Sequence, residues 1–316
     1  MNNNITPCIT VVGSINMDLV FRTPRMPMLG ETITGTGFQQ VPGGKGANQA
    51  VAAARQGAEV HFVGAVGDDG FGDHAVRCLA AEGIGVADIV SATGKPSGVA
   101  GIFVDGNGAN SIVLAPGANA QLSPEHVERA VATIASAAFL ICQLESPLAS
   151  VMRAIHIARA NEVQVVFNPA PAQAIPNGLL ALVDYLIVNQ TEAAQLSGIE
   201  VSDTDSAARA AEALRAHGAS AVLVTMGEHG VLVAAPGHQR FLAAVKVDVV
   251  DTTAAGDTFV GVFTVGMARG MSIDDAVIEA QFAAACAVTR MGAQTSIPTR
   301  EEVLQMMRSK QPRGVP

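Results

Sequence analysis

The chain has 316 residues, of which 49% are hydrophobic and 15% are charged, so it can bury a large core. Its formal net charge of -9 at pH 7 and the lack of a Lys/Arg cluster argue against a nucleic-acid partner. The uncharged run of residues 130–144 is too short and too polar to span a bilayer, which argues against a membrane protein.

The cysteines and the first residues of the chain bear on its compartment. The cysteines at positions 8, 78, 142 and 286 lack C-x-x-C spacing and are expected to be reduced thiols, not a zinc site or a disulfide framework. The N-terminus has no basic region ahead of an apolar segment, so we expect no signal peptide. We therefore expect a cytoplasmic protein with a single α/β domain over residues 1–316.

The first predicted strand, residues 8–13, leads to Asn16 and Asp18. Residues two apart on a strand point to the same face, so this pair could hold sugar hydroxyls. A solvated strand end explains the pair better when it is taken alone. Turn signals over residues 15–41 predict a small β appendage. Its second half is a predicted hairpin within residues 97–116, with its turn at Asp105–Gly108.

A glycine-rich turn over residues 42–50 precedes an Ala-rich helix that is expected to end near Gly57. It is not a Walker A loop, because Lys45 is followed by glycine. It is not a clean dinucleotide fingerprint either, because Gln49 stands where a third glycine belongs. A plain glycine turn is the alternative, but Lys45 and Asn48 beside three glycines favour a ligand-binding role.

Apolar strands then alternate with helices, and this pattern predicts a mainly parallel sheet covered on both faces. Strands are expected at residues 59–67, 139–144, 163–167, 185–188 and 221–225. Ligands of such sheets lie beyond the carboxyl ends of the strands. Polar or glycine-rich segments follow these strands at Glu145, Asn189–Glu192 and Thr225–Gly230. We therefore expect the functional site at this edge.

The stretch Asp251–Phe259 carries the strongest chemical signal. An apolar run over residues 241–250 predicts a strand before it, and residues 259–268 predict a helix after it. Small residues at a helix N-terminus make an anion site from unpaired N–H groups. Beside that site, the Asp257 carboxylate could deprotonate a hydroxyl that attacks a phosphoryl group. Capping of the helix by Asp257 explains the stretch equally well.

Three motifs together resemble the signatures of the ribokinase family of carbohydrate kinases: residues 43–50, Asn189-x-x-Glu192 and residues 251–257. The resemblance runs from about residue 9 to residue 298 in the family's order. Stretches most similar to the members that act on D-ribose are residues 13–18, 143–147, 168–171 and 288–294. The resemblance implies an α/β fold with a nine-stranded, mainly parallel central sheet, helices on both faces and a small β-sheet lid. The lid would comprise about residues 15–41 and 97–116 and would pair two subunits in a homodimer.

The resemblance also implies ATP-dependent phosphorylation of D-ribose at its 5-hydroxyl, with a role for each matched residue. Asp257 would be the general base, and the N–H groups around 254–256 would form the anion hole. Residues implied to bind the sugar are Asn16, Met17, Asp18, Gly44, Lys45, Gly46, Ala47, Asn48, Glu145 and Asp257. Residues implied to bind ATP are Asn189, Thr225, Met226, Gly227, Glu228, His229, Gly230, Ala255, Gly256, Asp257 and Gln281.

Two cations are implied in the same way. Glu192 would act on Mg²⁺ through water. A potassium activator would be bound, mostly through backbone carbonyls, by Asp251, Thr253, Ala287, Arg290, Gly292 and Ser296. Gln281 departs from the family, which often has Asn or His at this adenine-pocket position.

Other functions stay open at this point. The same chemistry could act on 2-deoxyribose or another sugar, because these sugars differ by as little as one hydroxyl. A non-catalytic sugar or nucleotide sensor could use the same fold, although the intact Asp257, Glu192 and Lys45 argue against it. A nicotinamide-dependent oxidoreductase lacks the glycine fingerprint that it would need after the first strand.

Overall fold

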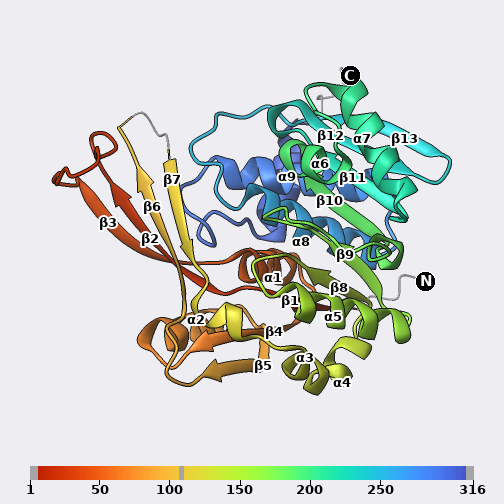
Figure 1. Ribbon diagram of the computed structural model, residues 1–316. Coiled ribbons are helices and arrows are strands. Elements are labelled where there is room, and N and C mark those ends of the chain that lie inside the picture. Colours follow the sequence, from red (N-terminus) through yellow and green to blue (C-terminus); the bar gives the residue numbers. More distant parts are fainter. Residues whose placement is uncertain (1–5, 107–109, 311–316) are drawn as a thin grey trace.

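The computed structural model describes residues 6–106 and 110–310. The larger of its two sheets has nine strands in the order β13-β12-β11-β10-β9-β8-β1-β4-β5 (Figure 1). The strands from β11 to β5 are parallel, whereas β12 and β13 join the sheet antiparallel. The bounds are β1 Cys8–Val12, β4 Glu59–Gly67, β5 Gly85–Ala92, β8 Phe139–Cys142, β9 Gln164–Phe167, β10 Tyr185–Asn189, β11 Ala221–Thr225, β12 Gly230–Ala235 and β13 His238–Ala243. The predicted fold class is confirmed.

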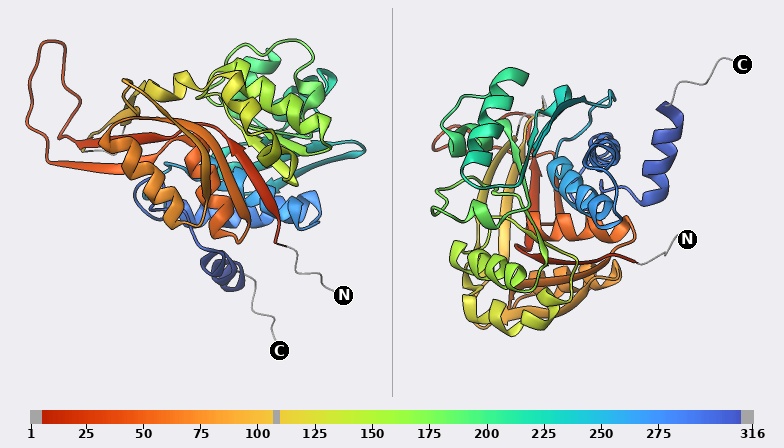
Figure 2. Two further views of the ribbon diagram at one scale, coloured as in Figure 1. Left: turned by 90° about the horizontal axis from the view of Figure 1, so that it is seen from below. Right: turned by 90° about the vertical axis from the view of Figure 1, so that its right-hand side faces the viewer.

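Two hydrophobic clusters, one on each face of this sheet, hold the helices in place. Figure 2 shows the helices as separate layers on either side of the strands. One layer contains α1 Lys45–Arg55, α2 Gly70–Ala81, α8 Ala255–Ala268, α9 Ile273–Val288 and α10 Arg300–Lys310. The other contains α3 Pro124–Arg129, α4 Val131–Ala135, α5 Leu148–Ala160, α6 Gln190–Ser197 and α7 Thr204–Ala216. Central strands such as β8 are apolar throughout because both of their faces are buried.

The smaller sheet has four strands in the order β3-β2-β6-β7 and extends away from the core (Figure 1). Its bounds are β2 Asn16–Arg22, β3 Gly37–Gly43, β6 Gly98–Val104 and β7 Asn110–Ala115. Only three residues separate β1 from β2, so the first strands of the two sheets are directly linked. Asn107 and Gly108 of the turn predicted between β6 and β7 lie outside the described residues.

The predicted strand over residues 241–250 is wrong. Strand β13 ends at Ala243, and the following residues have no regular structure until α8 begins at Ala255. The backbone N–H groups of Val250 and Asp251 donate to the carbonyl of Val288 at the end of α9, at 2.7 and 3.2 Å. A helix end therefore replaces the neighbouring strand as the hydrogen-bond partner of this segment.

Strand β5 was not predicted from the sequence, because it is an edge strand. Its residues are half-buried or exposed and include no run of apolar side chains. Among the described residues, no helix is both long and apolar enough to cross a membrane.

Candidate active site

The glycine turn before α1 lies in close contact with β2. Gly44 is the N-cap of α1 and has φ +92°, a conformation that favours glycine. A Cβ atom on Gly44 would lie 2.7 Å from the backbone N of Asn16, and one on Gly43 would lie 2.3 Å from Asp18 Oδ2. Gly44 must therefore lack a side chain for α1 to begin against β2, and Gly43 must lack one for β3 to pair beside Asp18.

Glu145, beyond the carboxyl end of β8, links β2 and α1. Its Oε2 atom accepts hydrogen bonds from Ser14 Oγ at 2.6 Å, from the backbone N of Lys45 at 3.1 Å and from Asn16 Nδ2 at 3.4 Å. Two of the predicted sugar-binding residues, Asn16 and Lys45, thus meet at the carboxylate of a third, Glu145.

Asn119 joins this group, although the sequence gave no reason to select it. Its Nδ2 donates to Asn16 Oδ1 at 2.7 Å, and its Oδ1 accepts from the backbone N of Ile15 at 2.9 Å. Asn119 lies in a short 3₁₀ helix, Gly117–Gln121, where a polar residue in a turn is unremarkable in sequence.

Acidic side chains crowd around one lysine at this edge of the sheet. Burial, with the nearby charges of Glu145 and Asp257, raises the pKa of Asp18 to about 7. The neighbouring Asp257 carboxylate raises the pKa of Lys45 against the opposing effect of burial, and Glu145 and Glu192 add to the rise. The pKa of Glu192 is itself raised, mainly by burial. Lys45 therefore carries a positive charge that interacts with three carboxylates, and its ammonium can also interact with an anionic ligand.

Asp257 lies in the first turn of α8 and is 7% exposed. The helix begins after Ala254, whose φ of +59° is left-handed, and no side chain caps it. The carboxylate instead faces α1, where Asn48 Nδ2 donates to Oδ2 at 2.9 Å and Gln49 Nε2 donates to Oδ1 at 3.0 Å. The backbone N–H groups that open a helix have no partners within it, so this turn offers donors to an anion beside a carboxylate.

Close packing of α8 on α1 makes these two contacts possible. A Cβ atom on Gly261 would lie 2.6 Å from both the Ala52 side chain and the Gln49 carbonyl oxygen. Glycine at this position brings the two helices together and so places the amides of α1 against Asp257.

A cavity of about 230 Å³ unites residues from several of the predicted motifs. Lys45, Glu192 and Asp257 line it. It shares Thr225, Thr252 and Gly256 with a second cavity of about 600 Å³. The two cavities therefore adjoin, with the helix N-terminus of α8 between them.

The larger cavity is mainly apolar. Residues 245, 247 and 249 line it, as do Phe259 and Ala284. The three alternate valines show why this segment resembled a strand in sequence, although they face a cavity and not a sheet. Gln281 also lines the cavity, with its Nε2 donating to the carbonyl of Leu242 at 2.9 Å. Such a cavity suits a flat ring with few polar groups.

Asn189 and Glu192 cap α6 reciprocally. Asn189 Oδ1 accepts from the backbone N of Glu192 at 2.8 Å, and Glu192 Oε2 accepts from the backbone N of Asn189 at 2.9 Å. The described residues contain no group of three or more His, Cys, Asp or Glu side chains that could hold a metal. A single carboxylate fits Mg²⁺, which keeps waters and relies on substrate phosphates for its other ligands.

Asp251 joins two of the segments that were predicted to bind potassium. Its Oδ1 accepts from the backbone N and the Oγ1 of Thr253, at 2.9 and 2.6 Å, and its Oδ2 accepts from the backbone N of Gly292 at 2.9 Å. Ser296 is fully buried and donates to the carbonyl of Ala293 at 2.8 Å. The Arg290 side chain points to Glu302 instead, and its Nη2 donates to Glu302 Oε1 at 2.6 Å. Carboxylate, hydroxyl and carbonyl oxygens of this kind fit a hard monovalent cation.

Several other predicted residues do not present their side chains to these cavities. Met17 alternates with Asn16 and Asp18 along β2 and lines a different cavity, of about 520 Å³, with Asp69. The side chains of Ala47 and Met226 are buried in the two hydrophobic clusters. His229 is exposed. The remaining residues of the predicted ATP loop line the larger cavity: Thr225, Gly227, Glu228 and Gly230.

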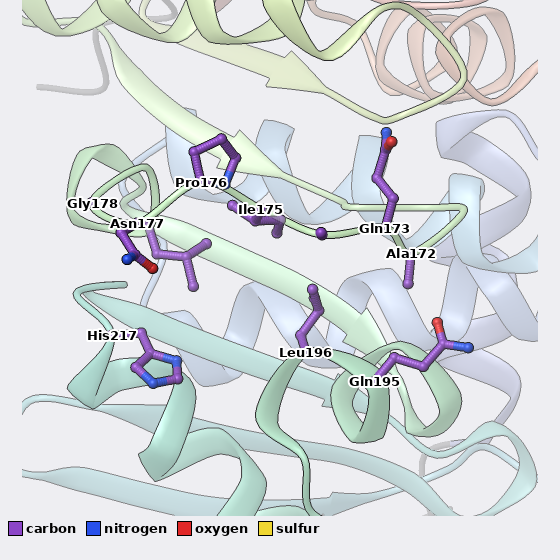
Figure 3. A pocket seen from close by; sticks show the side chains of 11 residues that line it. Ala172, Gln173, Ile175, Pro176, Asn177, Gly178, Gln195, Leu196 and His217 are labelled. Atoms are coloured by element: carbon purple, nitrogen blue, oxygen red, sulfur yellow. The ribbon is translucent and has the colours of Figure 1, made fainter.

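A further cavity, of about 670 Å³, lies apart from this site (Figure 3). The segment Ala172–Gly178, with Gln195, Leu196 and His217, lines it. Among the described residues, no acidic side chain, lysine or arginine lines this cavity. It therefore lacks the charges that phosphoryl transfer needs.

Comparison with known proteins identifies the family. Residues 7–300 match the model of the pfkB family carbohydrate kinases. The chain belongs to this family. It is 46% identical to the ribokinase of Haemophilus influenzae over 95% of this chain and 98% of that protein. It is 37% identical to the deoxyribokinase of Salmonella typhi, over 93% and 96% of the two proteins.

A solved structure extends this similarity to three dimensions. The structure of Arabidopsis thaliana ribokinase complexed with ribose and ATP superposes with a TM-score of 0.90 at 31% sequence identity. The match covers 96% of this chain and 99% of that one. The chain is therefore a carbohydrate kinase of the pfkB family with the ribokinase fold.

Proposed function

We propose that this kinase transfers the γ-phosphoryl group of ATP to the 5-hydroxyl of D-ribose. One observation carries the proposal: Asp257 lies at the N-terminus of α8 in a cavity that Lys45 and Glu192 also line. The similarity to the ribokinase of Haemophilus influenzae and to the Arabidopsis complex supports ribose and ATP as the substrates.

On the sugar side, the polar groups around Glu145 hold the ribose hydroxyls, with Asn16 and Asp18 on β2 and Asn48 on α1. Asp257 accepts the proton of the 5-hydroxyl as its oxygen attacks the γ-phosphorus. The bond from that phosphorus to the oxygen that bridges it to the β-phosphate breaks, and ADP leaves. Unpaired N–H groups at the start of α8 and the Lys45 ammonium stabilise the negative charge on the phosphoryl oxygens.

On the nucleotide side, the apolar cavity beside Gln281 receives the adenosine, and its phosphates extend towards α8. Glu192 would hold Mg²⁺ through water, and the bound metal would neutralise phosphate charge. The residues proposed to hold potassium are Asp251, Thr253, Ala287, Arg290, Gly292 and Ser296. Because Asp251 lies four residues before Ala255, that cation would order the anion-binding turn.

The smaller sheet is proposed to be the lid and to pair two copies of the chain. Its strands carry exposed apolar side chains, including Phe38 at 51% and Val113 at 70%. Phe21 packs against Phe38 and Phe103, with ring centroids 4.9 and 5.4 Å apart. Exposed aromatic and branched residues on one sheet are typical of a protein interface. A closed lid would also exclude water from the phosphoryl group.

The second candidate is the same reaction on 2-deoxyribose, which the similarity to the Salmonella deoxyribokinase favours. A coupled ADP-release assay with ATP and Mg²⁺ distinguishes the two, with ribose, 2-deoxyribose, fructose and adenosine as acceptors, each with and without potassium. The proposal expects the highest kcat/KM on ribose and a further increase with potassium. A higher kcat/KM on 2-deoxyribose would identify the second candidate. Ribose binding without turnover on any acceptor would identify a sensor.

A further inference from the structure

We propose that Gln49 is a positioning residue that sets the orientation of the Asp257 carboxylate. This inference rests on the proposed function of Asp257 as the base. Gln49 is fully buried on α1. Its Nε2 atom donates both to Asp257 Oδ1, at 3.0 Å, and to Asn168 Oδ1, at 3.1 Å. Both amide hydrogens of Gln49 are therefore committed to fixed acceptors.

The amides around Gln49 allow only one orientation. Asn168 donates from Nδ2 to the backbone carbonyl of Ile187 at 2.9 Å, so it must present Oδ1 to Gln49. Gln143 donates from Nε2 to Gln49 Oε1 at 2.6 Å. A reversed Gln49 amide would place oxygen against the Asp257 and Asn168 oxygens and NH₂ against NH₂. Because leaving buried polar groups unpaired is costly, Gln49 always offers a donor to Asp257.

A glycine in the surrounding backbone leaves space for these hydrogen-bonded side-chain amides. A Cβ atom on Gly13 would lie 2.1 Å from Gln143 Oε1, so only glycine fits beside that side chain. Gln143 follows β8, Asn168 follows β9, and Asp257 opens α8. The orientation of the Asp257 carboxylate thus depends on three segments other than its own: α1, the end of β8 and the end of β9.

Asn48 and Gln49 are adjacent, yet their roles differ. Asn48 Nδ2 donates to Asp257 Oδ2 at 2.9 Å, but Asn48 Oδ1 is buried with no hydrogen-bond partner among the described residues. That acceptor is available to a sugar hydroxyl. Gln49 offers no polar atom to a substrate, because its Nε2 and its Oε1 both hydrogen-bond within the protein. Loss of Gln49 should therefore change the chemical step and not substrate binding.

The test compares Gln49→Leu, Gln49→Glu and the control Gln56→Leu. Gln56 is a fully buried amide that follows the last residue of the same helix, and its Nε2 donates to the carbonyl of Pro298 at 3.2 Å. For each variant, kcat, KM for ribose, KM for ATP and Tm are measured with potassium present, and kcat is followed from pH 5 to pH 9.

Gln49→Leu is expected to lower kcat by about 10- to 100-fold, because a small misplacement of a reacting group costs that much. Both KM values should stay within about threefold. In Gln49→Glu, two carboxyl groups within hydrogen-bond distance share a proton, so the acidic limb of the pH profile should move to higher pH. Lys45, Asp18 and Glu192, the charged groups that interact with Asp257, are unchanged in every variant, so this shift reports on position 49. Gln56→Leu should lower Tm and leave kcat within about twofold.

The results that would contradict the role of Gln49 differ from those that would contradict the proposed function. Wild-type turnover with an unchanged kcat in Gln49→Leu would overturn the positioning role and leave the proposed function standing. A kcat loss in Gln56→Leu equal to that in Gln49→Leu, with an unmoved pH profile in Gln49→Glu, would assign the effect to general packing. A wild-type chain without turnover on any sugar would overturn the proposed function, and the role of Gln49 with it.

Discussion

Replacement of Asp18 by asparagine should stabilise the protein at the expense of its activity. Asp18 is 7% exposed, and burial together with Glu145 and Asp257 raises its pKa from 3.8 to about 7. The folded state therefore binds a proton that the unfolded state releases between these two values. The stability that this proton provides is fully present below pH 3.8 and is lost as the pH rises through about 7.

The size of this effect follows from the two pKa values. At roughly 1.4 kcal/mol for each pKa unit, the rise from 3.8 to about 7 corresponds to about 4 kcal/mol. At pH 8 the wild type bears this full cost of a buried, repelled carboxylate, whereas asparagine has the same shape and no charge. The Asp18→Asn variant should therefore be more stable than the wild type by up to about 4 kcal/mol at pH 8, with a smaller difference at pH 5.

Urea unfolding of both proteins at pH 5, 6, 7 and 8 measures the difference directly. Asp275→Asn, a change at an exposed acidic residue on α9, is the control for the removal of one carboxylate. The KM for ribose should rise in Asp18→Asn, because an amide oxygen is a weaker acceptor for a sugar hydroxyl than a carboxylate oxygen. Parallel stability curves for wild type and Asp18→Asn across this pH range would refute the stated effect of burial, Glu145 and Asp257 on Asp18.

Two further predictions concern the turn that opens α8. Asp251→Ala should lower turnover and reduce its increase with potassium, because Asp251 accepts hydrogen bonds from both Thr253 and Gly292. Turnover is measured as potassium is titrated. A titration that matches the wild type would show that Asp251 does not belong to the proposed cation site. Ala254→Gly should raise the free energy of unfolding by about 1 kcal/mol, since Ala254 has φ +59° and glycine adopts this conformation without strain. Urea unfolding that shows a loss of stability would mean that the Ala254 methyl group contributes packing that outweighs the strain.

Much of the core could be predicted because local signals and long-range packing agree there. Apolar runs such as the β8 strand, Phe139–Cys142, are buried on both faces, so the sequence pattern and the final environment match. The carboxyl ends of parallel strands lie at one edge of a sheet, so the sequence pattern predicts Glu145, Asn189 and Thr225 at the same edge. The edge strand β5 has only half-buried and exposed residues and therefore no comparable signal.

The contacts among side chains could not be predicted in the same way. Gln49, Gln143, Asn168 and Asp257 come from four separate segments, and a glutamine in an Ala-rich helix has no local feature that marks it as buried. The segment over residues 244–250 shows the opposite case, because its alternating valines have the period of a strand. Whether such a segment pairs with a strand or lines a cavity depends on neighbours that are distant in sequence.

We propose above that Asp257 deprotonates the sugar hydroxyl that attacks ATP. The most direct measurement is the kcat of Asp257→Asn with ribose, ATP and Mg²⁺, together with ribose binding by calorimetry. The account predicts that kcat falls by roughly 100-fold or more, while the Kd for ribose changes by no more than a few-fold. Turnover close to the wild-type value would contradict it and would leave Asp257 with a structural role only.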